Sequence, residues 1–204
     1  RYGIDVSSFQ GEIDWDAVAD DNIDFAMVRV GFRGTGTGSL NTDKYYEQNI
    51  RGAMRAGLET GVYFFAQAVT VEEAIEEADY VISLLDGLDI NGPVAYDWEM
   101  HDSTYRVYGT SPEMATACAV AFCERIKDAG YTPMVYGGTY VTYMKYDQGA
   151  LADYLSWYPE YKSEKSEKLC PTLVYHMDYW QFSSSRAVAG INGRVDMNIQ
   201  FIRR

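Results

Sequence analysis

Apolar and polar positions alternate along the chain in two different periods, and this predicts strands and helices in regular succession. Five short apolar runs are each followed by a segment with helical period. The expected strands cover residues 2–7, 25–32, 60–68, 92–99 and 132–138. The expected helices cover residues 14–22, 43–57, 70–85, 111–130 and 139–154. This order predicts five consecutive strand–helix units.

The helix expected at residues 70–85 has the strongest signal of the five. Thr70 and Glu73 have the spacing of a capping box at its start. Its apolar residues recur at helical intervals and predict one buried face, made of Val71, Ala74, Ile75, Ala78, Ile82 and Leu85.

After residue 154 the pattern changes, because three further strand-like segments follow with no helices between them. These cover residues 155–161, 173–182 and 194–202. The early strands are continuous apolar runs, which is typical of a parallel sheet covered on both faces. A barrel and a doubly wound sheet both fit, and the eight expected strands are as many as a barrel needs. The sequence therefore predicts an α/β fold, with residues 1–204 as a single domain.

The strand expected at residues 92–99 is unusual, because its apolar run VAYDWEM contains two acids. Asp97 and Glu99 are two residues apart, so in a strand they share one face while Trp98 occupies the other. Two carboxylates in a dry site repel, and one of them then holds its proton near neutral pH. A proton donor beside an anion suits glycoside hydrolysis. The alternative is a solvated or salt-bridged acid pair at a strand end.

Two more acids interrupt apolar strands near the two ends of the sequence. Asp5 lies in GIDVSSFQ and Asp196 lies in GRVDMNIQF. If the barrel closes, the first and last strands are neighbours, and both acids reach the rim that Asp97 and Glu99 occupy. Four acids at one rim are hard to explain as stabilisation, since buried like charges cost free energy. For Asp5 alone, a turn cap is the simpler alternative.

Aromatic side chains are expected near the same rim, in a chain that is 15% aromatic. They are Tyr63, Phe65, Tyr136, Trp157 and Trp180, the last of which precedes Gln181. Each could equally be a core residue. Rings at strand ends that face several acids would suit a sugar, which offers apolar faces for stacking and hydroxyl groups for carboxylates.

The net charge of −13 argues against nucleic acid as a partner, because phosphate contacts require clustered Lys and Arg. The most basic stretch, residues 161–169, is interrupted by Glu164 and Glu167 and predicts a solvated loop. No apolar run approaches the ~18 residues that span a bilayer, so no membrane insertion is expected. The chain begins with a strand-like segment and shows no signal peptide, as expected of a mature or trimmed protein.

The sequence lacks the residues or spacings that several common kinds of site require. Cys118 and Cys123 are five residues apart on an expected helix, which is poor disulfide geometry, so three reduced thiols are expected. With only His101 and His176, neither a zinc site nor a Ser–His triad is favoured. His101 could contact Glu99, although a surface loop position is preferred. The glycine-rich residues 31–40 lack P-loop and dinucleotide-binding spacing, and predict a flexible loop.

The chain resembles the glycoside hydrolase family 25 lysozymes, the Chalaropsis-type muramidases, almost from end to end. The resemblance rests on YGIDVSSFQGEIDW, FAMVRVGF, AGLETGVYFFAQAVTVEEAIEEADY, VAYDWEM, MVYGG and YWQFSSSRAVAGINGRVDMNIQF. It implies a single flattened TIM-like barrel of five β/α units and three further strands. It also implies hydrolysis, with retention, of the β-1,4 bond from N-acetylmuramic acid to N-acetylglucosamine in peptidoglycan. No metal or organic cofactor is expected.

The resemblance also implies roles for the site residues. Glu99 matches the general acid/base, and Asp97 matches its partner, which either assists the N-acetyl group of the substrate or attacks the sugar directly. Asp5 and Asp196 match the other two site acids, and Tyr63 matches a site tyrosine. A secreted or cell-wall-associated monomer acting on bacterial peptidoglycan is expected.

One departure from the family pattern lies in the sixth expected strand, where Pro159 replaces an alanine and puts contacts by Trp157 and Tyr161 in doubt. Two other functions remain open at this point. One is hydrolysis of another N-acetylhexosamine polymer such as chitin. The other is a non-catalytic glycan-binding module, which would have no need for a paired acid.

Overall fold

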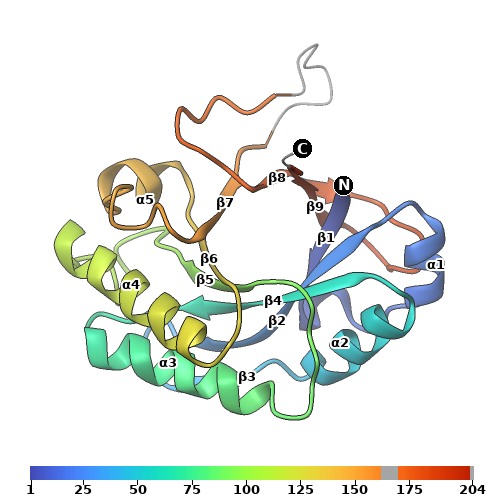
Figure 1. Cartoon of the computed structure of the whole chain (residues 1–204), viewed down its shortest axis with the longest axis horizontal. Coiled ribbons are helices and arrows are strands. Elements are labelled where there is room, and N and C mark those ends of the chain that lie inside the picture. The colour runs from blue at the N-terminus through green and yellow to red at the C-terminus, as the bar shows by residue number, and fades with distance from the viewer. Residues whose placement is uncertain (162–169, 203–204) are drawn as a thin grey trace.

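The computed structural model describes residues 1–161 and 170–202 and shows a β-barrel with helices packed around it (Figure 1). Within these described residues, nine strands form one sheet in the order β1-β9-β8-β7-β6-β5-β4-β2-β3, and an additional β1–β2 pairing closes all but β3 into a barrel. The barrel strands are β1 (Tyr2–Val6), β2 (Phe25–Arg33), β4 (Glu59–Ala66), β5 (Val94–Trp98), β6 (Pro133–Tyr136), β7 (Leu155–Pro159), β8 (Tyr179–Arg186) and β9 (Val195–Gln200). The closed barrel confirms the α/β prediction and excludes the doubly wound sheet.

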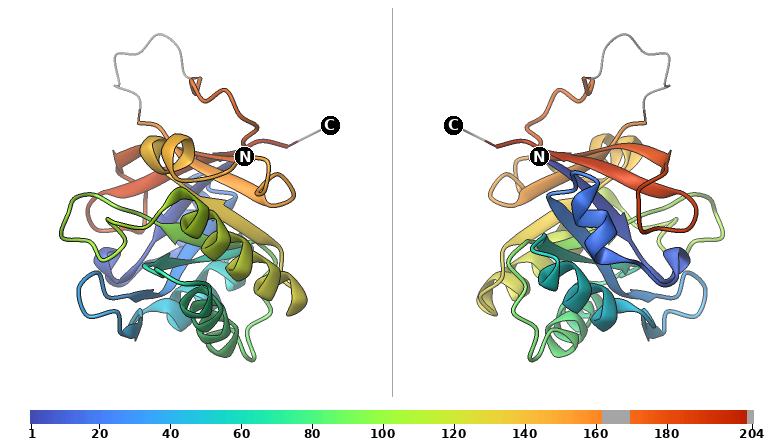
Figure 2. Two further views of the ribbon diagram at one scale, coloured as in Figure 1. Left: turned by 90° about the vertical axis from the view of Figure 1, so that its left-hand side faces the viewer. Right: turned by 90° about the vertical axis from the view of Figure 1, so that its right-hand side faces the viewer.

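Helices follow each of the first five barrel strands, as the sequence predicted. They are α1 (Trp15–Asp20), α2 (Tyr46–Arg55), α3 (Val71–Leu84), α4 (Pro112–Asp128) and α5 (Thr139–Met144). Barrel strands β1 to β8 run parallel, whereas β9 is antiparallel to both of its neighbours, β8 and β1. Figure 2 shows α3 and α4 side by side against the barrel. Within the described part of the chain, no helix has the length and apolar character needed to cross a membrane.

Along β2, β4, β5 and β6, successive side chains alternate between two separate apolar clusters. In β5, Val94, Tyr96 and Trp98 join the large cluster that includes the helix residues. Ala95 joins a smaller cluster made only of strand residues, and this cluster fills the barrel interior. Asp97 follows Ala95 on that inner face and therefore points into the end of the barrel.

Helix α3 starts as predicted, but the helix is rotated about its axis relative to the predicted buried face. The Oγ1 atom of Thr70 accepts a hydrogen bond from the backbone N–H of Glu73 at 3.3 Å. The buried residues of the helix are Ala74, Glu77, Ala78 and Val81. Ile75 is exposed instead, and Glu77 is buried because its carboxylate pairs with the buried guanidinium of Arg33 at 2.7 Å.

The glycine-rich loop expected at residues 31–40 begins only after β2 ends at Arg33, and it leads into an additional short strand. β3 (Leu40–Thr42) pairs antiparallel with the end of β2. The backbone N–H of Gly34 donates to the carbonyl of Ser39 at 2.9 Å, and Gly38 has a φ of 70° that favours glycine. The glycines therefore form the turn of a hairpin.

Two other boundaries differ from the predictions. Helix α5 ends ten residues earlier than expected, because the Asp147 carboxylate accepts from the backbone N–H of Gly149 at 2.8 Å and forms a turn. The strand expected at residues 173–182 forms only from Tyr179 onward. Val174 is 79% exposed and Tyr175 is also exposed, so neither has a buried face that would place it in the sheet. The lysines of the predicted solvated loop lie outside the described residues.

Candidate active site

A cavity of about 390 Å³ opens at the end of the barrel where the parallel strands terminate. Its lining includes every predicted site residue except Trp180: Asp5, Tyr63, Phe65, Asp97, Glu99, Tyr136, Trp157 and Asp196. The four predicted acids are therefore brought together, although they come from both ends and the middle of the chain. This placement agrees with the position of sites at the carboxyl ends of barrel strands.

Asp5 and Asp196 are direct neighbours across the β1–β9 pair, as closure of the barrel predicted. The Gln181 side-chain amide donates to the carboxylates of Asp5 and Asp196 at 2.8 and 3.2 Å, and Asn198 Nδ2 donates to Asp5 at 2.8 Å. Burial, and then the charge of Asp196, raises the pKa of Asp5 to about 7. Burial, and then the charge of Glu99, raises the pKa of Asp196 to about 6.

Asp97 and Glu99 form the second pair, and their carboxyl groups are hydrogen-bonded to each other. Burial and then the charge of Glu99 raise the pKa of Asp97 well above its usual range. Burial also raises the pKa of Glu99, while His101 and the hydrogen bond from Asp97 oppose that rise. Repulsion between the two carboxylates and the deeper burial of Asp97 therefore favour a proton on Asp97.

Aromatic rings form one wall of the cavity. The ring of Trp157 meets those of Tyr136 and Tyr63 edge to face, with centroids 4.8 and 5.9 Å apart. The hydroxyl groups of Tyr136 and Tyr161 both donate to Gln181 Oε1, at 3.1 and 3.0 Å. These contacts orient the Gln181 amide so that its N–H groups face the acids.

Trp180 does not reach the cavity. Its side chain is 1% exposed and packs with Tyr158, Met177 and Phe182 in a separate cluster. Its indole N–H donates to the carbonyl of Glu160 at 3.0 Å. Adjacent strand residues point to opposite faces, so the neighbouring Gln181 enters the site instead. The expectation that Trp180 contacts substrate is therefore corrected.

The strand that departs from the family pattern keeps its aromatic residues at the site. Trp157 and Tyr161 both line the cavity, although Pro159 lies between them. Pro159 is paired with Gln181 in the β7–β8 ladder. The indole N–H of Trp157 donates to Asn198 Oδ1 at 2.8 Å, which holds the ring in place.

His101 lies in an exposed loop, as preferred, but it also contacts the site. Its side chain is exposed, but the Nε2 atom lies 3.3 Å from Glu99 Oε2, and the ring lines the cavity. The imidazole also meets the ring of Tyr105 edge to face. His101 is therefore both a loop residue and a direct neighbour of Glu99.

Sequence reasoning missed a group of lining residues from the β1–α1 region and from β2. Phe9 is 84% exposed at the cavity edge, and the guanidinium of Arg29 lies 5.0 Å from the centre of its ring. Arg29 pairs with the buried carboxylate of Asp43 at 2.8 Å. The signal for Arg29 was present, because it is a charge within the apolar run FAMVRVGF, as Asp5 is in its own strand.

The polar groups of the cavity are mainly carboxylates and phenols rather than an arranged set of metal ligands. Among the residues that the structure describes, no group of three or more His, Cys, Asp or Glu side chains is placed to hold a metal ion. Burial, and then the charge of Asp5, raises the pKa of Tyr63 well above its usual range, so its phenol remains a hydrogen-bond donor. The arrangement can donate a proton, stabilise a developing positive charge and bind hydroxyl groups.

Comparisons with characterised proteins point to carbohydrate chemistry. The autolytic lysozyme of Clostridium acetobutylicum is 26% identical over 197 residues, which cover 96% of this chain and 54% of that protein. Lysozyme M1 of Streptomyces globisporus is 27% identical over 201 residues, which cover 96% of this chain and 66% of that protein. The chain thus spans about half to two thirds of the length of these relatives.

Solved structures share the fold over nearly the whole chain. The bacterial lysozyme from Streptomyces coelicolor superimposes with a TM-score of 0.78 at 25% identity, covering 98% of this chain and 91% of that one. The modular autolysin LytC from Streptococcus pneumoniae, in complex with a synthetic peptidoglycan ligand, superimposes with a TM-score of 0.80 at 26% identity. The match covers 98% of this chain and 46% of that one.

A family model covers most of the chain as well. The model for glycosyl hydrolases family 25 matches residues 4–191, a range that contains Asp5, Asp97 and Glu99. The expected resemblance is thereby confirmed, and the chain belongs to glycosyl hydrolase family 25.

Proposed function

We propose that residues 1–204 form one catalytic domain of a lysozyme. It cleaves the β-1,4 bond between N-acetylmuramic acid and N-acetylglucosamine in peptidoglycan, with retention. The observation that carries this proposal is the meeting of two acid pairs, Asp97–Glu99 and Asp5–Asp196, in one aromatic-walled cavity. Membership in family 25 and the peptidoglycan ligand of the LytC structure support the substrate class.

Glu99 acts as the general acid and then the general base. Substrate that covers the pair excludes water from Glu99, which raises its proton affinity and favours transfer of the shared proton from Asp97 to Glu99. Glu99 gives that proton to the glycosidic oxygen as the bond from this oxygen to the muramic acid C1 breaks. In the second step Glu99 takes a proton from the attacking water.

Asp97, once ionised, assists the N-acetyl group of the substrate. Its carboxylate accepts a hydrogen bond from the acetamido N–H while the acetamido oxygen bonds to C1 from the face opposite the leaving oxygen. Water then attacks C1 from the face that the leaving oxygen has vacated and displaces the acetamido oxygen, so two inversions give net retention. Direct attack by Asp97 on C1 is the competing route. It would leave a glycosyl ester on Asp97 in place of a cyclic acetamido intermediate.

The other site acids and rings hold the sugar. Asp5 and Asp196 share the amide of Gln181 and offer acceptor atoms for substrate hydroxyl groups. Tyr63, Phe65, Tyr136 and Trp157 supply apolar faces for sugar rings. The relatives that are lysozymes and autolysins support action at the cell wall by a secreted or wall-associated protein, which we expect to be a monomer.

The proposal is tested with purified peptidoglycan and the Glu99→Gln variant. The native protein should reduce the turbidity of cell walls and release new reducing muramic acid ends. Glu99→Gln should lose roughly 10²–10⁴-fold in rate, because it cannot give or take the proton. Intact activity of the variant would contradict the role of Glu99. Cleavage of chitin oligomers in place of peptidoglycan, or wall binding without product, would reject the proposed reaction.

A further inference from the structure

Glu99 lies just beyond the sheet, so the strand ladder does not hold its backbone. β5 ends at Trp98, which is paired with Ala66 of β4, and on the other side the last pair is Asp97 with Tyr136. A general acid must be held in a narrow range of positions, since a displacement of 1 Å can cost about 10²-fold in rate. The backbone of Glu99 therefore needs support from outside the ladder.

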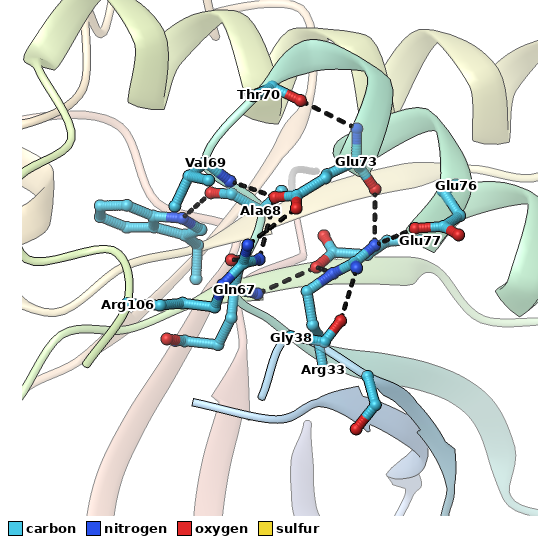
Figure 3. Close-up of polar contacts among 12 residues, drawn as sticks. Arg33, Gly38, Gln67, Ala68, Val69, Thr70, Glu73, Glu76, Glu77 and Arg106 are labelled. Atoms are coloured by element: carbon cyan, nitrogen blue, oxygen red, sulfur yellow. Dashed lines mark hydrogen bonds and ion pairs between the residues drawn. The ribbon is translucent and has the colours of Figure 1, made fainter. Parts of the chain in front are cut away.

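The turn after β4 supplies that support (Figure 3). The Nε2 atom of Gln67 donates to the backbone carbonyl of Glu99 at 2.7 Å. The indole N–H of Trp98 donates to the carbonyl of Ala68 at 3.0 Å. Two consecutive residues of the turn thus hold two consecutive residues at the end of β5.

Helix α3 in turn fixes Gln67. The backbone N–H of Gln67 donates to the carboxylate of Glu77 at 3.0 Å, and Glu77 is held by the buried Arg33 at 2.7 Å. On the other side, the carbonyl of Gln67 accepts from Arg106 at 2.8 Å. The Arg106 guanidinium is itself paired with Glu73 at 2.7 Å. Figure 3 shows these two arginine–glutamate pairs around the turn.

The side chain of Gln67 is unusual for so buried a position. It is fully buried, and its Oε1 atom has no hydrogen-bond partner among the described residues. A buried amide oxygen of this kind costs stability, and an apolar side chain of similar shape would avoid the cost. Residues that oppose the stability of a fold are frequent where a function requires them.

We propose that Gln67 is a positioning residue that holds the backbone of Glu99 so that its carboxyl group faces Asp97 and the glycosidic oxygen. The inference rests on the proposed function of Glu99. Gln67 does not contact substrate, because it lies outside the residues that line the cavity. The ligand-binding residues are unaffected by its removal, so its effect falls on the chemical step.

The test compares Gln67→Met with the native protein. Met has nearly the same shape but no donor, so kcat on peptidoglycan should fall by roughly 10- to 100-fold while KM stays within about twofold. The melting temperature should be equal or higher. Asn49→Leu is the matched control, since it removes a buried amide that has no hydrogen-bond partner among the described residues, on α2 and away from the cavity. It should leave kcat unchanged.

Titration of the acid pair gives a readout that does not depend on activity. In Gln67→Met the hydrogen bond between Asp97 and Glu99 is misaligned, so the higher of the two pKa values of the pair should fall. Carboxyl ¹³C NMR, assigned with Glu99→Gln, measures this shift, and the alkaline limb of the kcat profile should move to lower pH. An inactive native protein would reject the proposed function, whereas the NMR shift would still decide the positioning role.

A second variant covers the case in which Gln67→Met does not fold. Gln67→Asn keeps an amide but is one methylene shorter, so it should also lose the contact with Glu99 and show the same fall in kcat. A folded variant of either kind with native kcat and native carboxyl titration would overturn the proposal. A fall in melting temperature together with native kcat would also overturn it, by showing a structural role only.

Discussion

Buried or partly buried carboxylates lie on both sides of the Trp98–Glu99 segment, yet their surroundings shift their pKa values in opposite directions. In the cavity, Asp97 and Glu99 face each other, and burial raises both of their pKa values. Behind the segment, Glu73 meets the guanidinium of Arg106, which lowers the pKa of Glu73. Carboxylates therefore have raised pKa values on the cavity side, as the proposed proton transfer requires, whereas behind the segment a carboxylate has a lowered pKa and forms an ion pair.

The position of the cations explains this contrast. Arg33 and Arg106 both lie behind the segment, where each contacts a glutamate. Arg29 lines the cavity but is paired with Asp43. Glu77 combines features of both sides, because it is paired with Arg33 but is also deeply buried. Burial raises its pKa to about 7 even though Arg33 opposes the rise. Carboxylates without a dedicated cation keep protons, and these are the groups that a glycosidase requires.

The largest effect that would sharpen this comparison concerns Glu73. Glu73→Gln should lower the free energy of unfolding by about 2 kcal/mol at pH 7, because it removes a charged partner of Arg106. The lowered pKa of Glu73 means that its contribution is present above the ordinary value and disappears as pH falls through the folded-state value. The loss should therefore shrink in acid, as measured by urea denaturation at pH 7 and pH 3.

The neighbouring Glu76→Gln is the control for that experiment. Glu76 also pairs with Arg33, but its side chain is 59% exposed. Exposed pairs contribute little, so the change should stay within about 0.5 kcal/mol. Equal losses in the two variants would contradict the view that Glu73 and Arg106 stabilise this side of the segment.

A smaller effect of opposite sign is expected for Asp5 on the cavity side. The pKa of Asp5 is raised to about 7, so the folded protein binds a proton that the unfolded chain releases near pH 4. Stability linked to Asp5 is therefore present at low pH and lost as pH rises through 7. Asp5→Asn should raise stability by about 1 kcal/mol at pH 8 and change little at pH 4.

Thermal unfolding at the two pH values checks this expectation. Asn can still accept the hydrogen bonds from Gln181 and Asn198 through its oxygen, so packing should survive. The variant should also lose activity, because Asp5 lines the cavity. Destabilisation of the same size at both pH values would show that Asp5 is not a strained carboxylate.

The smallest expected effect concerns Phe9, at the edge of the cavity. Its ring is exposed, and Arg29 lies over one face, which leaves the other face for a sugar. Phe9→Ala should raise KM about three- to tenfold with stability unchanged, since stacking on an aromatic ring contributes roughly 1 kcal/mol. Steady-state kinetics on soluble glycan fragments measure this change.

Two control variants test whether the effect on KM comes from the ring of Phe9. Phe9→Trp should retain the native KM, because it keeps a flat ring. Tyr140→Ala removes an exposed ring on α5 that does not line the cavity, and should leave KM unchanged. If all three variants behaved alike, the ring of Phe9 would have no role in binding.

Sequence patterns predicted the α/β class, because strands and helices alternate, and the family resemblance implied the barrel. The meeting of the four acids then followed from closure of the sheet. The predictions from sequence failed where the burial or direction of a side chain depends on residues that are distant in the sequence. The exposed Ile75 on α3 could not be foreseen, since the helix turns to bury Glu77 against Arg33, 44 residues away in sequence. The inward position of Gln181, and not Trp180, depends on the register of β8, which a single sequence does not define.

The pairing of β1 with β9 has a consequence for the order of assembly. During synthesis, Asp97 and Glu99 are made before β9, the strand that carries Asp196. Asp5 is made near the start of the chain, whereas its hydrogen-bond partner Asn198 is made near the end. A ribosome-bound fragment that ends before β9 has an open sheet and only part of the acid cluster. If the proposed function holds, cleavage of the cell wall should therefore begin only after β9 pairs with β1 and closes the barrel.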